Sequence, residues 1–406
     1  MSKKFLFMTL TVAIFVFLVE AVSSLGLFFL ASRKNLVYAP QVRLTLTSPQ
    51  KKIVLKILHQ EEKYITHHPG LGWSVKPNGS TELYRANSQG IRADHNYPLT
   101  PEENKIRILS FGDSFTHGDE VHNNETWQEY LNALDPRLET LNFGVSGYGV
   151  DQALLRYLQE GRKFHPQVVL IGFMSEDPTR HGSVYRPFFL PQSDFVLTKP
   201  RYKLTGGRLQ LIGNPLPAVE DYHQFLTQER QLLRKLGQED FYFQNQTVPH
   251  FADKMAVVRL IKLLFAQYIN PKDNIFTQES MYDPDSEIFQ VSVAILETFY
   301  KSILEDGAIP VIVIIPSTGD LMRLQKHQLK NYQPFLKVFE NKKWNYIDIT
   351  DPFLYDKRNA ASFVPLFAPE YHFTALGNQR MAEYIYQYLT EKDLLPKKQT
   401  PQVKAE

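Results

Sequence analysis

The sequence predicts a flavodoxin-like, three-layer α/β/α domain built on a parallel sheet of five strands. Two observations support this. The runs 168–171 (VVLI) and 311–315 (VIVII) are continuously apolar and rich in β-branched residues, which is typical of strands buried on both faces of a sheet. From Ile106 onward, short apolar segments also alternate with longer amphipathic ones, and this alternation predicts β-α units with parallel strands.

An N-terminal membrane segment comes first. Lys3 and Lys4 precede the apolar stretch Phe5–Ala31, which exceeds the roughly 20 residues needed to span a bilayer. A cleaved signal peptide ending near Ala21-Val22-Ser23 is the alternative, but the apolar run continues beyond that point. Glu20 interrupts the stretch, and a carboxyl group inside a membrane usually faces protein. We expect residues 1–32 to form a signal-anchor.

Four further regions follow the anchor. Residues 33–68 are expected to be a connector, 69–392 the α/β domain, and 393–406 a polar flexible tail. Within the domain, residues 178–284 are too long for a loop and form a predicted insertion. Its Gly206-Gly207 pair predicts a β-hairpin between segments 201–204 and 208–212, and helices are expected at 225–236 and 252–268. This insertion is expected to cover or flank the site and to select the substrate.

Apolar periodicity predicts the strands and helices of the domain. Strands are expected at Ile106–Phe111, Glu139–Phe143, Val168–Phe173, Ile309–Ile315 and Trp344–Ile347. Helices are expected at Trp127–Leu134, Asp151–Lys163, Glu287–Leu304, Gln325–Glu340 and Ala375–Leu389. In a doubly wound sheet, ligands bind beyond the carboxyl ends of the strands.

A serine lies at such a strand end. Gly112-Asp113-Ser114 follows the first strand, where a helix can begin, and the backbone N–H groups of that turn can hold a developing oxyanion. Taken alone, Asp113 or Ser114 is as well explained as a helix cap. A second motif, Glu370-Tyr371-His372, changes that balance. A carboxylate two residues before a histidine can bind one imidazole nitrogen and leave the other free to deprotonate a serine.

Together these motifs resemble the SGNH (GDSL) hydrolase superfamily, in particular its membrane-anchored bacterial members. The first block of the family is matched by 111–116 (FGDSFT), the second by 142–149 (NFGVSGYG), and the last by 370–372 (EYH). The segment 87–92 (NSQGIR) also resembles the one that precedes the serine in anchored members. The resemblance implies the SGNH fold and a catalytic triad of Ser114, His372 and Glu370. It also implies an oxyanion hole that includes the amides of Ser114 and Gly147.

Two positions depart from the family pattern. Glu370 stands where an aspartate is usual, although a glutamate can orient a histidine equally well. Glu176 stands where the family has an asparagine that donates to the oxyanion, and an ionised carboxylate cannot donate. Either Glu176 points elsewhere, or it is protonated, or Ser175 or a loop residue supplies the donor, or the hole has two amides only. We also expect Asp113 to brace the turn and His117 to lie at the rim of the site.

The expected activity is hydrolysis of small acyl esters, such as acetyl groups on carbohydrate. Two alternatives remain open: an O-acyltransferase acting on an envelope polysaccharide, and a degenerate domain that only binds. No metal or organic cofactor is expected, and the absence of cysteine excludes thiolate chemistry and a disulfide framework. The balance of 45 Lys+Arg against 43 Asp+Glu gives no indication of nucleic-acid binding. We expect the anchored domain to lie on the extracytoplasmic side.

Overall fold

The computed structural model describes residues 3–34, 43–245, 251–265, 275–277, 279–327, 329–350, 353 and 363–396. Its central element is a sheet of five parallel strands in the order β4-β3-β5-β8-β9. Numbered along the chain within this sheet, the order is 2-1-3-4-5, the flavodoxin-like arrangement. The predicted fold class is therefore confirmed. The strands are β3 Ile106–Phe111, β4 Leu138–Asn142, β5 Val168–Met174, β8 Ile309–Ile315 and β9 Tyr346–Asp348.

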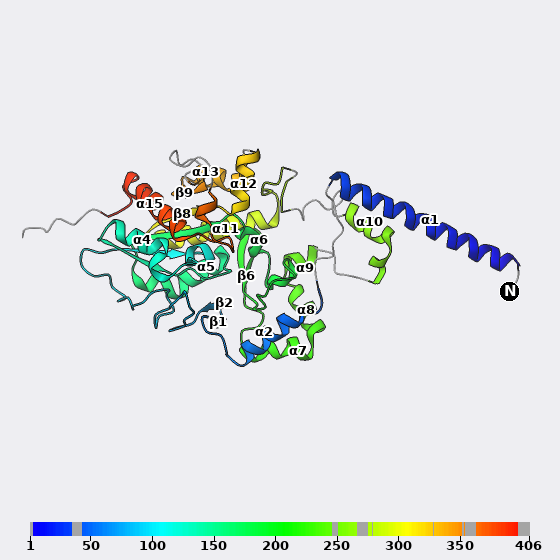
Figure 1. Cartoon of the computed structure of the whole chain (residues 1–406), viewed down its shortest axis with the longest axis horizontal. Helices are drawn as coiled ribbons and strands as arrows, with labels where there is room; N and C mark the ends of the chain where they lie inside the picture. The colour runs from blue at the N-terminus through cyan, green and yellow to red at the C-terminus, as the bar shows by residue number, and fades with distance from the viewer. Residues whose placement is uncertain are drawn as a thin grey trace, which may run out of the picture.

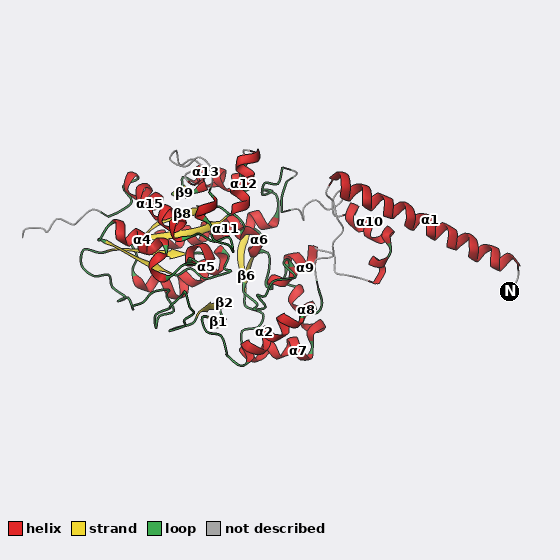
Figure 2. Ribbon diagram, viewed as in Figure 1, coloured by secondary structure: helices red, strands yellow, loops and turns green. Residues whose placement is uncertain are grey.

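Alternate residues of the strands contribute to two separate cores, one on each face of the sheet. Ile108, Leu170 and Val313 pack with helices α4 and α15 on one face. Leu109 and Ile171 pack with α5, α11 and α13 on the other. Figure 2 shows the strands enclosed between helices. The covering helices are α4 Trp127–Leu134, α5 Val150–Arg156, α11 Glu287–Glu305, α13 Gln333–Lys342 and α15 Ala375–Glu391.

Two of the predicted helices outside the insertion are divided in the structure. The predicted helix 325–340 is replaced by α12 Thr318–His327 and α13, and Pro334 in the first turn of α13 marks the break. Proline lacks an N–H donor and is tolerated only in a first helical turn. The predicted helix 151–163 starts as α5 but continues as a π-turn, Tyr157–Gly161, and a 3-10 turn, Arg162–Phe164.

The insertion contains the predicted hairpin, formed by β6 Arg201–Thr205 and β7 Arg208–Ile212. The predicted helix 225–236 is split because Gln228 has non-helical angles, with φ −135° and ψ 34°. Of the predicted helix 252–268, residues 266–268 lie outside the described part. The helices here are α6 Asp177–His181, α7 Gln224–Thr227, α8 Glu229–Gly237, α9 Phe241–Asn245 and α10 Ala256–Leu264, with 3-10 turns Arg186–Phe188, Val219–His223 and Phe251–Lys254.

The residues before the sheet pack on the α/β domain. Helix α2, Ser48–Leu58, contacts the insertion at α7. Strands β1 Ile65–His68 and β2 Gly72–Val75 form an antiparallel hairpin. The Trp73 indole donates to the Ser146 carbonyl at 3.0 Å, and the Tyr148 hydroxyl donates to the Trp73 carbonyl at 2.6 Å. This hairpin therefore braces the loop that follows β4.

Helix α1, Lys3–Lys34, is long and apolar enough to cross a membrane, although a signal sequence would pass the same test. It projects away from the part of the molecule that contains the sheet, and α10 lies against the end nearest that part (Figure 1). Its outward side chains are largely exposed, among them Phe7, Phe17 and Phe28, each at 72%.

Candidate active site

Ser114 is the first residue of α3, a four-residue helix, Ser114–His117, that begins directly beyond β3. The Asp113 carboxylate caps this helix by accepting from the Phe115 N–H at 3.0 Å. Gly112 must be glycine, because a Cβ there would lie 2.2 Å from Thr116 Oγ1 and 3.1 Å from the Gly172 carbonyl. The close approach of β3, α3 and β5 thus fixes the serine at the carboxyl edge of the sheet.

A buried ion cluster ties this turn to the loop after β5. One Arg180 nitrogen lies 3.1 Å from Asp113 Oδ2 and 2.9 Å from Asp177 Oδ1, and it also donates to the Tyr148 carbonyl at 2.5 Å. Asp177 Oδ2 in turn accepts from the Met174 N–H at 3.0 Å. Asp113 therefore connects the serine turn to the loop after β5, in agreement with the bracing role expected of it. Burial raises the pKa of Asp177, Arg180 opposes that shift, and Asp113 adds to it.

His372 precedes α15 and is held by Glu120. The imidazole Nδ1 lies 2.9 Å from Glu120 Oε2, and the His372 backbone N–H donates to the same oxygen at 2.9 Å. Glu120 Oε1 accepts from the Glu370 N–H at 3.0 Å. The Phe115 ring lies 5.1 Å from the imidazole, so the residue next to Ser114 contacts His372.

This geometry differs from the predicted pairing of His372 with Glu370. The side chain of Glu370 is exposed, and the residue contacts Glu120 through its backbone N–H alone. The reason is a tight turn: Tyr371 has φ +73°, the Tyr371 N–H donates to the Ala368 carbonyl at 2.9 Å, and the Ala368 N–H donates to the His372 carbonyl at 2.7 Å. The turn carries the Glu370 side chain outward and brings Glu120 to the imidazole.

Glu120 itself has an unusual backbone. Its φ is +70°, a left-handed conformation that costs a residue with a side chain about 1 kcal/mol or more. Its N–H donates to the Tyr84 hydroxyl at 2.9 Å, which helps to hold this conformation. Glu120 is not among the site residues predicted from the sequence. The signal available was a carboxylate just after Gly118, in the loop that leaves the serine helix.

In a catalytic triad the histidine lies within hydrogen-bond reach of the serine, but this bond between Ser114 and His372 is not formed in the structure. Among the described residues, none joins the Ser114 hydroxyl to the imidazole. Catalytic contacts are often longer in a protein without substrate and tighten in the complex. Ser114 is buried, with 8% of the residue exposed.

The loop after β4, which contains Gly147, contacts the serine turn. The Asn142 side chain accepts from the Gly144 N–H at 2.9 Å and donates to the His117 carbonyl at 3.0 Å. The Val145 N–H donates to the Gly112 carbonyl at 3.1 Å. Gly147 has φ +81°, and within the described chain no acceptor is found for its N–H or for that of Ser114. Both amides are thus available to an oxyanion.

The structure favours neither of the residues considered as a third donor. The Ser175 hydroxyl is fully buried and donates to the Asp320 carboxylate. Glu176 is exposed. Desolvation on its protein side raises the pKa of Glu176, Arg180 opposes this shift, and Asp320 and Asp113 add to it.

His117 is not at the rim, as expected, but fully buried. Its Nδ1 lies 2.5 Å from Asp119, and its Nε2 lies 2.8 Å from the Tyr64 hydroxyl. Burial lowers the pKa of His117 to about 4, with Arg92 lowering it further and Asp119 opposing. A neutral ring therefore donates from Nδ1 and accepts at Nε2. Asp119 also accepts from the Ser146 hydroxyl at 2.8 Å, so this network supports both site loops.

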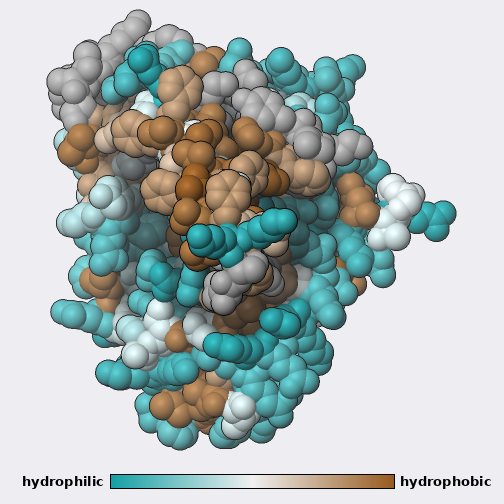
Figure 3. Space-filling view, turned by 90° about the vertical axis from the view of Figure 1, so that its right-hand side faces the viewer, coloured by the Kyte–Doolittle hydropathy of each residue, from teal (hydrophilic) through white to brown (hydrophobic). Residues whose placement is uncertain are grey.

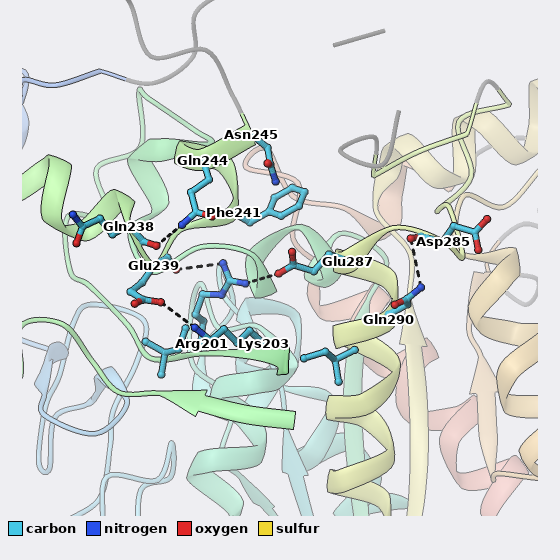
Figure 4. A pocket seen from close by; sticks show the side chains of 12 residues that line it. Arg201, Lys203, Gln238, Glu239, Phe241, Gln244, Asn245, Asp285, Glu287 and Gln290 are labelled. Carbon is cyan, nitrogen blue, oxygen red and sulfur yellow. Dashed lines mark hydrogen bonds and ion pairs between the residues drawn. The ribbon is translucent and has the colours of Figure 1, made fainter. Parts of the chain in front are cut away.

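Two cavities lie on the insertion side. One, of about 490 Å³, is lined by charged residues of the insertion and α11 (Figure 4), and its cations are paired: Arg201 with Glu287 at 2.8 Å and Lys203 with Glu239 at 3.5 Å. Neither Ser114 nor His372 lines it. A smaller cavity also lacks Ser114 and His372 but touches the loops around the serine turn at Gly147 and Arg180; its other lining residues are Trp73, Ser183, Arg186, Phe189, Leu197 and Lys199. The described residues hold no group of three or more side chains suited to a metal ion.

No family model and no curated protein matches the chain. Among solved structures, it is similar to a putative lipolytic protein of the G-D-S-L family from Desulfitobacterium hafniense, with 12% identity, 70% of this chain and 100% of that one covered, and a TM-score of 0.36. A catalytic mutant of an acetylxylan esterase from Geobacillus stearothermophilus shows 12% identity, 70% and 94% coverage, and a TM-score of 0.36. A lipase/acylhydrolase from Enterococcus faecalis shows 13% identity, with 73% of this chain and 100% of that one covered, and a TM-score of 0.36. The functional assignment therefore depends on the residues of the site.

Proposed function

We propose that this chain is a serine esterase of the SGNH type that hydrolyses small acyl esters, with Ser114 as nucleophile, His372 as base and Glu120 as the orienting acid. The observation that supports it most is the 2.9 Å contact between Glu120 Oε2 and His372 Nδ1, close to a serine at a strand-to-helix turn. Glu120 takes the role that the sequence motif suggested for Glu370.

The proposed reaction has two steps. Glu120 accepts a hydrogen bond from the Nδ1–H of His372, which holds the tautomer whose unprotonated Nε2 takes the proton of the Ser114 hydroxyl, and the Glu120 carboxylate then stabilises the imidazolium. The serine oxygen then bonds to the ester carbonyl carbon, and the carbonyl oxygen becomes an oxyanion that accepts from the Ser114 and Gly147 amides. Cleavage of the ester C–O bond releases the alcohol, which receives the proton from His372. Water attacks the acyl-serine in the same way and releases the acid.

The same site could pass the acyl group to a sugar hydroxyl instead of water. The N-terminal helix favours this second candidate, because a membrane-anchored domain would work beside envelope polysaccharide. We propose an extracytoplasmic location, with α1 kept as an anchor. The contact of α1 with α10 supports retention, since a cleaved α1 could not make it.

The test uses full-length protein in detergent with p-nitrophenyl acetate, acetylated xylan and a serine-directed fluorophosphonate. Wild type is expected to turn over ester and to be labelled, whereas Ser114→Ala and His372→Ala should each lose nearly all activity, because triad residues act as a unit. Faster acetyl transfer to an added glycan than to water would favour the transferase. A wild type that shows neither turnover nor labelling would leave only a binding role.

A further inference from the structure

The carboxylate of Glu20 caps helix α10. Glu20 lies within the apolar helix α1, and its two oxygens accept from the Ala256 N–H at 2.6 Å and the Val257 N–H at 3.2 Å. The N-cap residue of α10, Met255, offers no capping side chain. The first N–H groups of a helix need acceptors, and in lipid no water is present to supply them. The Glu20 carboxylate within the apolar helix α1 thus has a specific partner, the N-terminus of α10.

Helix α10 packs closely along α1. Leu260 lies over Gly26, with its Cδ2 only 3.3 Å from where a Cβ on Gly26 would sit, and Ser23 of α1 is only 5% exposed. Small residues at such positions let two helices approach, as they do in membranes. Because Ala256 is beside Glu20 and Leu260 beside Gly26, the two helices run in the same direction.

The face of α10 that points away from α1 is apolar and uncovered. Ile261 is 61% exposed and Phe265 51%, and the preceding 3-10 turn adds Phe251 at 79%. Two lysines of residues 251–265 contact side chains of the same segment. Lys262 pairs with Asp253 at 2.6 Å, and Lys254 lies over the Phe251 ring at 4.7 Å. Figure 3 faces the end of the molecule from which α1 projects and shows apolar side chains gathered there.

We infer that residues 251–265 enter the lipid bilayer beside α1 and form a second membrane contact of the protein. The occupant of the apolar face is lipid, because this face is continuous with the exposed apolar surface of α1. Nine helical residues span about 14 Å, half of a bilayer core, so α10 reaches into one leaflet only.

The test uses the absence of native cysteine. Full-length Ile261→Cys and Leu264→Cys, labelled with an environment-sensitive fluorophore, are placed in vesicles of phosphatidylethanolamine and phosphatidylglycerol containing doxyl-labelled lipid. Leu211→Cys is the matched control, because Leu211 is exposed at 45% but lies on the β7 hairpin. We expect a blue shift and at least twofold stronger quenching at positions 261 and 264 than at 211. Equal quenching at all three would overturn the inference.

A second pair of variants tests the cap. Glu20→Ala removes both acceptors and is expected to lower the quenching at position 261 toward that of the control, whereas Glu20→Gln keeps one acceptor oxygen and should retain most of it. If Glu20→Ala leaves quenching at position 261 unchanged, the carboxylate does not hold α10 in the membrane.

A separate observation concerns Arg186, which lies beside Gly147. One guanidinium nitrogen is 2.9 Å from where a Cβ on Gly147 would sit, and the guanidinium lies 5.3 Å from the centre of the Phe195 ring. Within the described chain, no carboxylate or carbonyl pairs with this guanidinium. The cavity that reaches Gly147 is lined by Arg186 as well.

The charges around Arg186 leave it cationic at neutral pH. Burial lowers the pKa of Arg186 to about 10, with Arg180 lowering it further and Asp113, Asp177 and Glu176 opposing. A half-buried cation without a partner is costly unless a ligand supplies the negative charge.

The geometry points to Arg186 as the third donor to the oxyanion, in place of the side-chain donor that neither Ser175 nor Glu176 supplies. This inference rests on the proposed esterase function. A guanidinium cannot be deprotonated at working pH and donates several N–H groups, so it suits an oxyanion better than the carboxylate of Glu176 does.

The experiment compares Arg186→Met with Arg208→Met, an exposed arginine on the β7 hairpin, in full-length protein with p-nitrophenyl acetate. Arg186→Met should lower kcat about 10²-fold with little change in KM, as loss of an oxyanion donor does. Arg186→Lys should recover part of that loss, and Arg208→Met should have no effect. A raised KM with unchanged kcat would instead assign Arg186 to substrate binding. An inactive, unlabelled wild type would overturn the proposed function, whereas an active wild type with an unaffected Arg186→Met would overturn this inference alone.

Discussion

At the scale of single residues, Glu176 shows how local exposure decides chemistry. It stands where the SGNH family, which the sequence resembles, has a donating asparagine. Its side chain is exposed, and although Glu176 is the N-cap residue of α6, its side chain makes no capping hydrogen bond. Desolvation raises its pKa and Arg180 opposes the shift, so the carboxyl lies in the electrostatic surroundings of the site. An exposed group of this kind contributes little to a preorganised oxyanion hole.

We therefore expect Glu176→Asn to change kcat/KM for p-nitrophenyl acetate less than about threefold near neutral pH. The measurement is a pH series of steady-state kinetics beside wild type. A gain of tenfold or more at alkaline pH would instead place a protonated Glu176 in the hole, and a large loss would assign it a catalytic role.

The sequence allowed Ser114, Gly147 and His372 to be assigned as candidates, because each lies in a short motif whose residue types match a chemical role. It did not allow the acid to be assigned. Glu370 has the expected spacing from His372, but the left-handed backbone at Tyr371 turns its side chain outward. Glu120 is distant from His372 in the chain and reaches it only through the fold.

At the scale of elements, the loop after β4 and the serine helix are in backbone contact. A Cβ on Gly144 would lie 2.2 Å from the His117 nitrogen and 2.6 Å from the Thr116 carbonyl carbon. No side chain can rearrange to relieve such a clash, because the atoms met belong to the backbone of α3. The position of Ser114 thus depends on a glycine in another element.

Gly144→Ala is expected to displace α3, to lower stability by about 2 kcal/mol or more, and to reduce esterase activity at least tenfold. The matched control is Gly213→Ala, where a Cβ would meet nothing within 4 Å. Thermal unfolding and kinetics of both variants in detergent check this. Equal effects of the two substitutions would show that the contact between loop and helix is unimportant.

Strands were predicted better than helices. The bounds of β3 and β8 agree with those expected, because continuous apolar runs ended by polar or glycine residues leave little freedom. The helix predicted over 325–340 was wrong because the apolar pattern continues across Pro334, which starts a new helix. The π-turn after α5 has no simple sequence signature. There, a Cβ on Gly161 would lie 2.4 Å from the Phe111 ring, so tertiary packing decides the local structure.

At the scale of the whole molecule, two fully buried histidines link stability to pH. Burial lowers the pKa of both His117 and His181 to about 4; Arg92 lowers that of His117 further, and Asp151 opposes the shift at His181. In the unfolded chain each would titrate near its ordinary value of about 6.5. Between these values the unfolded state binds more protons, so the stability due to each histidine is complete above about pH 6.5 and is lost as pH falls toward 4.

His181→Gln is expected to reduce the loss of stability between about pH 6.5 and pH 5 by roughly 1 kcal/mol. Glutamine can keep both contacts of His181, which bonds Ser292 and the Val150 N–H. The control is the same substitution at an exposed histidine, His223→Gln. Comparing the two variants cancels the pH dependence of stability that other groups contribute, among them Asp177 and Asp240, whose raised pKa values favour the folded state as pH falls. An unchanged slope in denaturant titrations of His181→Gln would contradict the buried neutral imidazole.

The architecture was predicted from apolar runs and their alternation with helices, since these follow directly from burial. Within the insertion, the hairpin was predicted correctly, but the bounds of the helices were not. Its hairpin depends on a local Gly-Gly turn, whereas α10 depends on Glu20, which lies 236 positions earlier in the chain. Contacts of that separation leave no local pattern.

In the proposed mechanism, Glu120 and not Glu370 orients His372. The decisive measurement of this assignment is kcat/KM for p-nitrophenyl acetate in two matched variants of the full-length protein, Glu120→Gln and Glu370→Gln. Glu370 contributes only its backbone N–H, which the substitution retains, so Glu370→Gln should stay within about twofold of wild type. Glu120→Gln should lose about 10³-fold or more, because the imidazole loses its charged partner. A large loss in Glu370→Gln with an active Glu120→Gln would show that Glu370, and not Glu120, orients His372.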